Sequence, residues 1–278
     1  MNQAIIISDL HCGCQFGLCP PTPVRLDGGG TYQSSTLQQK MWSMWREMWD
    51  EWVPEVTRGE PFALVINGDT TDGRHHGSTS QVSQNLTDQK NIAMECLLPV
   101  LSLPQCHALY MIRGTEAHVG PSGENEENLA ASLGAIPDDN GNHARFELWL
   151  RIGGENGALA HILHHIGTTG STHYETSALN RALAEACSEA GRWGYPAPDF
   201  VIRAHRHRWS KVTLPTRKGY AICEVTPAWQ LKTPFCYRIP GGAFTTAQWG
   251  GILIRQGDEE HYSRAFVKSA VRSPEVVI

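Results

Sequence analysis

Short apolar runs alternate with longer amphipathic segments along the first two thirds of the chain, and this alternation is the strongest constraint on its fold. The runs are rich in β-branched residues and have the length of buried strands. They cover residues 4–8, 62–67, 108–112, 146–152, 158–163 and 200–204. Helical patterns lie between several of them, at 36–53, 87–103 and 177–191. Strands that alternate with helices predict an α/β fold.

Segment 36–53 carries methionines and tryptophans at three- and four-residue spacings, which predict an amphipathic helix. This Met/Trp stripe consists of Met41, Met44, Trp45, Met48, Trp49 and Trp52. We expect the stripe to pack in the core. The density of tryptophan leaves open a second interpretation, in which the stripe is a platform for a substrate or partner.

The last quarter of the chain has a different pattern. Segments 221–225, 251–254 and 262–267 read as strands with little helix between them. We therefore expect residues 210–278 to be mostly β and the protein to hold a mixed sheet or two packed sheets. No internal repeat or charge block divides the sequence, so residues 1–278 are predicted to form a single domain. Two polar segments, 14–32 and 73–84, are predicted to be long loops.

Composition narrows the class of protein. The 278 residues are 41 % hydrophobic and 18 % charged, with a net charge of −5, which is typical of a globular protein that folds without disulfides. The mild acidity argues against a general nucleic-acid coat protein. No apolar run approaches the ~20 residues of a membrane span. The first residues lack the features of a signal peptide, so we expect a cytoplasmic protein.

The eight cysteines are interpreted as reduced thiols, with a metal or redox role left open for Cys12, Cys14 and Cys19.

Side chains that commonly bind metals follow the predicted strands, at the point where each strand ends. In chain order they are Asp9 and His11, Asp69 and Asp72, Thr115, Glu116 and His118, His164 and His165, and His205 and His207. Ligands of open α/β sheets bind outside the carboxyl ends of the strands. We therefore expect these side chains to meet at one edge of a sheet.

Spacing and residue type point to metal ions. Asp9 and His11 are two residues apart, as are His205 and His207, and an extended backbone directs such side chains to the same face. Carboxylate and imidazole without paired cysteines are typical ligands of Mn, Fe, Zn, Ni or Co. An aspartate shared by two such ions suits in-line attack on phosphorus.

Taken in order, these motifs resemble the series of calcineurin-like metallophosphoesterases. The residues that carry the resemblance are Asp9-x-His11, Gly68-Asp69-x-x-Asp72, Gly114-Thr115-Glu116, His164 and His205-x-His207. The resemblance implies a four-layer αββα sandwich with two mixed β-sheets and two divalent metal ions, with Mn²⁺ as the first choice. It also implies that the first metal binds Asp9, His11, Asp69 and His207, and that Asp69 bridges to a second metal held by His164 and His205.

The third motif departs from the family, which has Gly-Asn-His where this chain has Gly114-Thr115-Glu116. We expect either Thr115 or Glu116 to complete the second metal site. His118 is then the candidate that protonates the leaving oxygen. The alternative is that this loop is degraded and the second site weak.

Other residues near the predicted site are given supporting roles. Asp72 is expected to orient a ligand histidine. His164 is preferred to His165 as the ligand because it is the first residue after its apolar run. His165 and Arg206 are candidates for support or substrate contact, since charge beside a metal site attracts phosphate oxygens.

The sequence thus predicts a hydrolase that cleaves phosphoester bonds through a dinuclear metal centre and activated water. We expect a phosphodiesterase or nuclease, with a phosphoester substrate such as a nucleotide or nucleic acid and no membrane association. A phosphomonoesterase, a metallohydrolase with another substrate and a catalytically weakened scaffold on the same fold are the alternatives.

Overall fold

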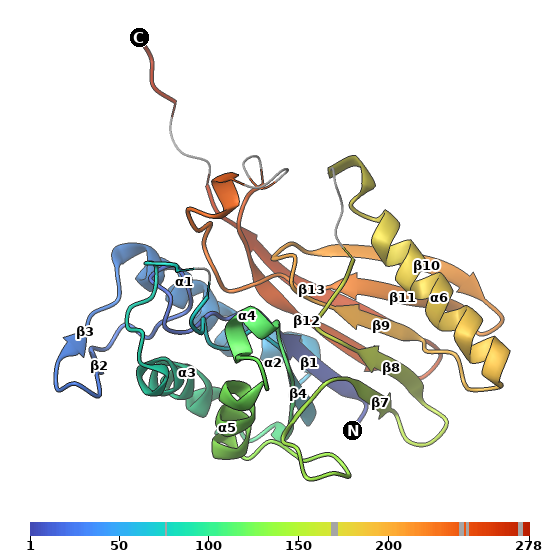
Figure 1. Cartoon of the computed structure of the whole chain (residues 1–278). Coiled ribbons are helices and arrows are strands. Elements are labelled where there is room, and N and C mark those ends of the chain that lie inside the picture. Colours follow the sequence, from blue (N-terminus) through green and yellow to red (C-terminus); the bar gives the residue numbers. More distant parts are fainter. Residues whose placement is uncertain (76, 168–171, 239–241, 243–244, 272–274) are drawn as a thin grey trace.

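Two β-sheets lie face to face between outer layers of helices in the computed structural model (Figure 1). The structure describes residues 1–75, 77–167, 172–238, 242, 245–271 and 275–278. Its described strands form two main sheets and one short hairpin, β2 (Val24–Arg25) with β3 (Thr31–Tyr32). The hairpin lies inside segment 14–32, which the sequence predicted to be a loop.

The first sheet contains six described strands, in the order β13-β12-β1-β4-β5-β6. They are β1 (Gln3–Ile7), β4 (Phe62–Asn67), β5 (Cys106–Ile112), β6 (Ala144–Arg145), β12 (Gln248–Gln256) and β13 (His261–Ser269). β1, β4, β5 and β6 run parallel, whereas β12 and β13 are antiparallel to their neighbours. The register therefore places the carboxyl ends of β1, β4 and β5 at one edge of the sheet.

The second sheet contains five described strands, in the order β10-β11-β9-β8-β7. They are β7 (Leu148–Ile152), β8 (Ala158–Ile162), β9 (Phe200–Arg203), β10 (Ser210–Thr216) and β11 (Gly219–Val225). The three inner strands are parallel and the two edge strands antiparallel. Both sheets are thus mixed, as predicted.

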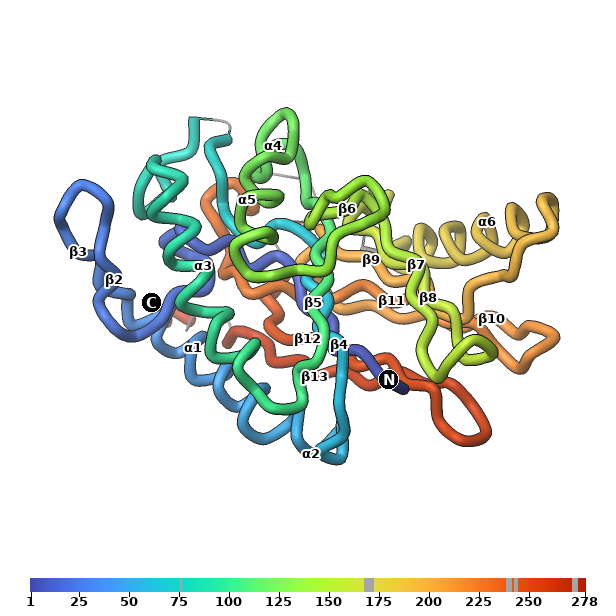
Figure 2. The backbone as a smooth tube through the Cα atoms, turned by 90° about the horizontal axis from the view of Figure 1, so that it is seen from below, coloured from blue at the N-terminus to red at the C-terminus, as the bar shows by residue number. Residues whose placement is uncertain are grey.

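Helices cover the outer face of each sheet. Outside the first sheet lie α1 (Thr36–Glu47), α2 (Val53–Thr57), α3 (Leu86–Leu101) and α5 (Glu124–Leu133); outside the second lies α6 (Ser177–Trp193). Figure 2 shows the same layers from below, with α6 on the opposite side of the molecule from α1 and α3. The short helix α4 (Glu116–Val119) follows β5.

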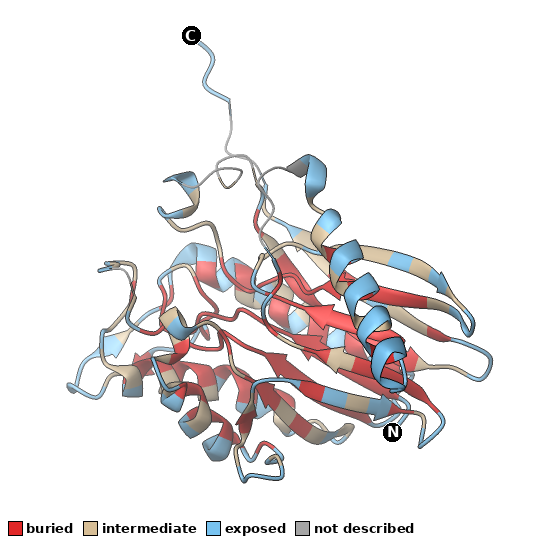
Figure 3. Ribbon diagram, turned by 45° about the vertical axis from the view of Figure 1, so that its right-hand side comes forward, coloured by how far each residue is buried: buried red, intermediate tan, exposed pale blue. Residues whose placement is uncertain are grey.

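Three apolar clusters fill the spaces between the four layers. One lies between the first sheet and its helices, one between the two sheets and one under α6. Strand β1 contributes Ile5 and Ile7 to the first cluster and Ala4 and Ile6 to the second. Both faces of β1 are buried, which explains its unbroken apolar sequence. Figure 3 shows the buried strands and the exposed outer faces of the helices. These layers confirm the sandwich implied by the resemblance to calcineurin-like metallophosphoesterases.

The Met/Trp stripe belongs to the core. Ser35 caps α1 through a capping box with Gln38, and the helix continues through a π-helical turn, η1 (Met48–Trp52), into α2. Trp45 and Trp49 are buried, and the ring of Trp45 packs 4.8 Å from that of Trp229, edge to face. The alternative of an exposed platform is therefore wrong for these buried tryptophans.

Two further predictions concern membranes and cysteines. In the described part of the chain, no helix is long and apolar enough to cross a membrane. All eight cysteines lie among the described residues, and each is a free thiol. Burial raises the pKa of Cys14 and of Cys19 to about 12, so both stay protonated at neutral pH.

Candidate metal centre

Five of the residues predicted to bind metal share an unusual backbone conformation. Among the described residues, six that are not glycine have a positive φ, and five of them are predicted ligands. These five are Asp9 (53°), His11 (45°), Asp69 (52°), His205 (71°) and His207 (55°). The sixth, Arg58, ends helix α2. Left-handed backbone is unfavourable for residues with a Cβ and is concentrated at functional sites.

Hydrogen bonds between loops hold this conformation. The amide of Asp9 donates to the carbonyl of Gly68 at 3.0 Å, and the amide of His11 donates to that of Asp69 at 3.0 Å. The amide of Trp229 donates to the carbonyl of Asp9 at 2.9 Å. The loops after β1 and β4 are therefore joined to each other and to the segment after β11.

Two glycines allow the loops to approach this closely. A Cβ on Gly68 would lie 2.4 Å from Nδ1 of His164, and one on Gly114 would lie 2.0 Å from Oδ1 of Asp69. Both distances are shorter than any ordinary contact, and Gly68 also has a φ of 82°. Glycine at these positions is therefore required by the packing of the site.

The first group of candidate ligands is Asp9, His11 and His207. Nε2 of His207 lies 3.2 Å from Oδ1 of Asp9 and 3.1 Å from Nε2 of His11. Two imidazole nitrogens and a carboxylate oxygen thus converge on one point.

The second group is Asp69, His164 and His205. Nε2 of His164 lies 3.1 Å from Oδ2 of Asp69 and 3.9 Å from Oδ1 of Asp9, so the two groups are neighbours. Nδ1 of His164 donates to the carbonyl of Asn67 at 2.6 Å, because a carbonyl can only accept. This bond directs Nε2 toward the carboxylates, the orientation that a ligand histidine needs.

Asp72 lies behind the first group. Its Oδ1 accepts a hydrogen bond from Nδ1 of His11 at 3.2 Å, and its backbone carbonyl accepts one from Nδ1 of His118 at 2.6 Å. The same carboxylate accepts a bond from Gln81 at 2.7 Å. Asp72 therefore fixes which nitrogen of His11 and of His118 faces the centre.

The charges in the site oppose the effect of burial. Burial would raise the pKa of Asp9, Asp69 and Asp72, but the nearby histidines outweigh it and hold all three pKa values below the ordinary range. Burial would lower the pKa of His164, but Asp69 and Asp9 raise it to about 10. Burial and a neighbouring imidazole lower the pKa of His118 to about 4.

The donor set fits divalent cations. Oδ1 of Asp9 is buried and accepts no hydrogen bond from the described residues, although His207 lies close to it. A buried ionised oxygen that accepts no hydrogen bond is costly unless positive charge balances it. Oxygen and imidazole ligands suit Mn, Fe, Zn, Ni or Co. The buried His/Asp groups could therefore hold metal ions.

The third motif brings Thr115 and not Glu116 to the second group. The amide of Thr115 donates to Oδ1 of Asp69 at 2.7 Å, and its hydroxyl lies 3.1 Å from the same oxygen. Glu116 is exposed on the first turn of α4, and its carboxylate makes no hydrogen bond or ion pair with the described residues. The sequence left both residues open as ligands.

Two residues with predicted supporting roles lie at the margin. His165 is exposed, with its ring 5.3 Å from that of His164. The guanidinium of Arg206 donates to the backbone carbonyls of Gly167 and Glu175. Arg206 thus links Gly167 and Glu175 to the segment that carries His205.

Sequence reasoning missed Glu126. This buried residue of α5 contacts the loops after β4 and β5. Burial, together with the charge of Asp69, raises its pKa to about 7. In sequence it is one of several acidic residues at a helix start, and no motif signal distinguishes it.

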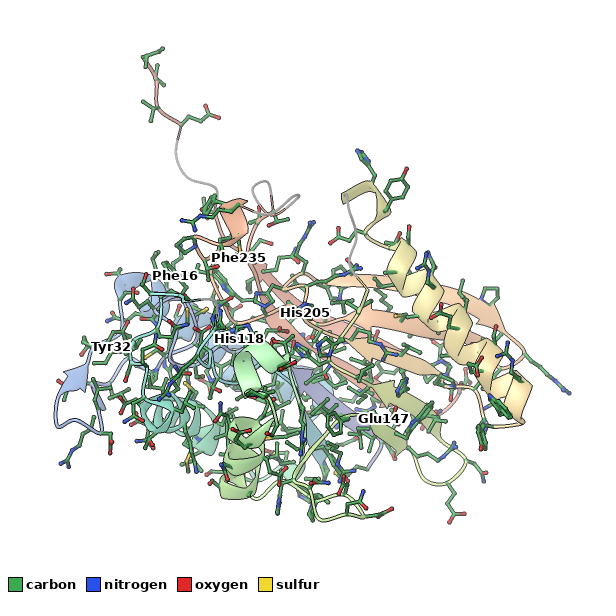
Figure 4. The ribbon with its side chains drawn as sticks, in the orientation of Figure 1. Phe16, Tyr32, His118, Glu147, His205 and Phe235 are labelled. Carbon is green, nitrogen blue, oxygen red and sulfur yellow. The ribbon has the colours of Figure 1, made fainter. Side chains whose placement is uncertain are left out.

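A cavity of about 890 Å³ opens onto both groups. Its walls include His11, Asp69, His118, His205, residues 77–80 and residues 230–236. Figure 4 shows His118, His205 and Phe235 around this region, each coming from a different segment of the chain. The cavity is much larger than a phosphate group.

Comparison with known proteins finds similarity only at a low level. No family model and no curated protein matches the sequence. Vacuolar Protein Sorting 29 from Cryptosporidium parvum is similar in structure, with a TM-score of 0.37 and 9 % identity over 97 % of this chain and 98 % of that chain. The solution NMR structure of Thermotoga maritima protein TM1076 has a TM-score of 0.34 and 10 % identity over 97 % and 100 % of the two chains. Similarity this low carries no functional argument, so the fold is assigned from its own layers and strand order.

Proposed function

We propose that the protein is a metal-dependent phosphodiesterase with two divalent cations at the edge of its sheets. The observation that carries the proposal is the contact between the two ligand groups, in which Nε2 of His164 lies 3.1 Å from Asp69 and 3.9 Å from Asp9. Asp9, His11 and His207 would hold one cation, and His164, His205 and Thr115 the other. Asp69 would be shared between them. When bound, the cations supply positive charge for the phosphate oxygens and lower the pKa of water.

The residues of the chain supply the remaining functions. Nδ1 of His118 donates to the carbonyl of Asp72, so Nε2 is the atom left to exchange a proton with substrate. His118 is neutral without substrate, since its pKa is about 4. A phosphodiester anion beside it would favour the protonated form and so let it protonate the leaving oxygen.

The cavity favours a diester over a simple monoester. A volume of about 890 Å³ accommodates substituents on both sides of phosphorus. A nucleotide or a nucleic-acid end is a substrate of this size. If nucleic acid is the substrate, its binding weakens as salt rises, because phosphate contacts release counterions.

The test is hydrolysis of bis(p-nitrophenyl) phosphate and p-nitrophenyl phosphate with Mn²⁺, by the wild-type chain and by Asp69→Asn. We expect faster turnover of the diester and a loss of more than about 100-fold in the variant, at least the effect of removing an outer-shell partner. Asp50→Asn on the exposed face of η1 is the matched control and should retain full activity. Preference for the monoester would redirect the assignment to small phosphorylated metabolites.

The outward position of Glu116 favours one alternative, a scaffold protein with a weakened second site. The two functions differ in how many cations the protein retains. A purified chain that holds two equivalents of Mn²⁺ supports the phosphodiesterase. One that holds fewer and hydrolyses neither ester with Mn²⁺, Zn²⁺, Co²⁺ or Ni²⁺ supports the scaffold.

A further inference from the structure

The carboxylate of Glu126 lies beneath the loops that follow β4 and β5. The residue is 2 % exposed and sits on the inner face of α5. Its Oε1 accepts hydrogen bonds from the amide of Thr70 at 3.2 Å and from the hydroxyl of Thr70 at 2.8 Å. Its Oε2 accepts one from the amide of Gly114 at 2.7 Å. One side chain therefore holds two loops that come from neighbouring strands.

These two loops carry parts of the second ligand group. Thr70 directly follows Asp69, and Gly114 directly precedes Thr115. The amide of Thr115 reaches Oδ1 of Asp69 at 2.7 Å because the loops lie this close together. The two loops are in close contact at Gly114, since even a Cβ at that position would overlap Oδ1 of Asp69. A small shift of either loop would therefore turn the carboxylate of Asp69.

The contacts require two acceptor oxygens on one side chain. A carboxylate accepts at both oxygens, whereas an amide accepts at one and donates at the other. Glutamine in place of Glu126 would direct its NH₂ group at the amide of Thr70 or of Gly114. That buried backbone amide would then lack an acceptor, which destabilises the arrangement of the loops.

We propose that Glu126 is a positioning residue that clamps the loops after β4 and β5 and so sets the orientation of Asp69 for cation binding. The part of this proposal that concerns cations rests on the proposed function. Glu126 acts through Thr70 and Gly114, which neighbour Asp69 and Thr115, and its own carboxylate is not one of the candidate ligands.

The experiment compares Glu126→Gln with Glu127→Gln in the full chain. Glu127 is a matched control because its carboxylate also accepts two backbone amides, those of His143 and Ala144, at 2.8 Å each. The first measurement is amide hydrogen exchange at Gly114 and Thr115 in protein freed of cations with EDTA. The second is the affinity for Mn²⁺ by isothermal titration calorimetry.

We expect Glu126→Gln to speed exchange at Gly114 and Thr115 by about tenfold, the effect of losing a buried hydrogen bond. We expect Mn²⁺ to bind about 10–100-fold more weakly, as when a partner behind a ligand is removed. Glu127→Gln should leave both quantities near their wild-type values. Thr70→Val removes one contact of the clamp, the hydrogen bond from the hydroxyl of Thr70. It should change the exchange rate and the Mn²⁺ affinity in the same directions as Glu126→Gln, but by smaller factors. This variant provides a second test if Glu126→Gln does not fold.

The outcomes separate the clamp from the function it serves. Unchanged exchange in Glu126→Gln would overturn the clamp. Faster exchange with unchanged Mn²⁺ affinity would overturn its role in cation binding. A wild-type chain that binds no Mn²⁺ would refute the proposed function and that role together, while the exchange measurement would still decide whether Glu126 holds the loops.

Discussion

Five of the candidate ligands have a backbone conformation that residues with a Cβ usually avoid. Left-handed backbone at a residue with a Cβ costs on the order of 1–3 kcal/mol, and Asp9, His11 and Asp69 all adopt it. The hydrogen bonds that join their loops offset part of this cost. The carboxylate of Asp72 and the carbonyl of Asn67 then select the nitrogen that His11 and His164, respectively, direct into the site. The strain and the tautomers are thus features of one preorganised site.

The role of His118 can be tested with two leaving groups. In His118→Asn we expect kcat to fall by about 10²–10⁴-fold for a diester with an alkyl alcohol as leaving group, because general acid catalysis contributes this much. The fall should be much smaller for p-nitrophenolate, which departs without a proton. The exposed residue His107 supplies the control His107→Asn. An equal loss with both leaving groups would contradict proton donation.

Helix α1 supports the site from behind. Trp45 packs edge to face against Trp229, whose amide donates to the carbonyl of Asp9. The stripe of large side chains therefore connects the helical layer to Asp9 through two contacts. Its contribution is to packing and not to substrate binding.

Trp45→Ala should destabilise the protein by about 3–5 kcal/mol, since it removes a fully buried aromatic side chain. Trp193→Ala, at a position that is 65 % exposed, should change the free energy of unfolding by no more than about 0.5 kcal/mol. Urea unfolding of both variants measures the difference. A rise in KM for Trp45→Ala at unchanged stability would instead indicate a substrate platform.

The strands and the residues that gather at their ends could be predicted from the sequence, whereas the contacts between loops could not. The apolar runs predicted β1, β4 and β9 closely because burial on both faces leaves an unbroken apolar signal. The choice between Thr115 and Glu116 depends on where α4 begins: Thr115 precedes the helix as its N-cap, and Glu116 lies on its first turn. Glu126 acts through tertiary hydrogen bonds to loops 12 and 56 positions away. No local pattern encodes such contacts.

At the scale of the whole molecule, buried polar contacts join the two sheets. Glu224 of β11 accepts hydrogen bonds from the indole of Trp209, at 2.7 Å, and from the hydroxyl of Ser263 on β13. Burial raises the pKa of Glu224, and these two hydrogen bonds oppose that effect only in part. The ionised form is therefore less favourable in the folded protein than in the unfolded chain.

The stability of the protein should depend on pH through Glu224. Because the folded pKa lies above the unfolded one, the contribution of this group is complete at low pH and is lost as pH rises through the folded pKa. Glu224→Gln cannot ionise, so its Tm should exceed that of the wild type at about pH 8 and the gap should narrow toward about pH 5. Thermal unfolding in EDTA measures the Tm of the wild type and of Glu224→Gln at each pH. The exposed Glu259→Gln is the control. A gap that does not change with pH would contradict the assignment.

The pairing of β1 with β12 has a consequence for the order in which the protein is made and folds. Asp9 lies beside the amide of His205, 196 positions later in the chain, and β1 lacks one neighbour until residues 248–256 are present. Contacts between such distant positions form slowly, because a long loop must close first. During synthesis the first candidate ligands, Asp9 and His11, are therefore made long before the strands that complete their surroundings. Uptake of a cation is expected to accompany the last step of folding and not to nucleate the first.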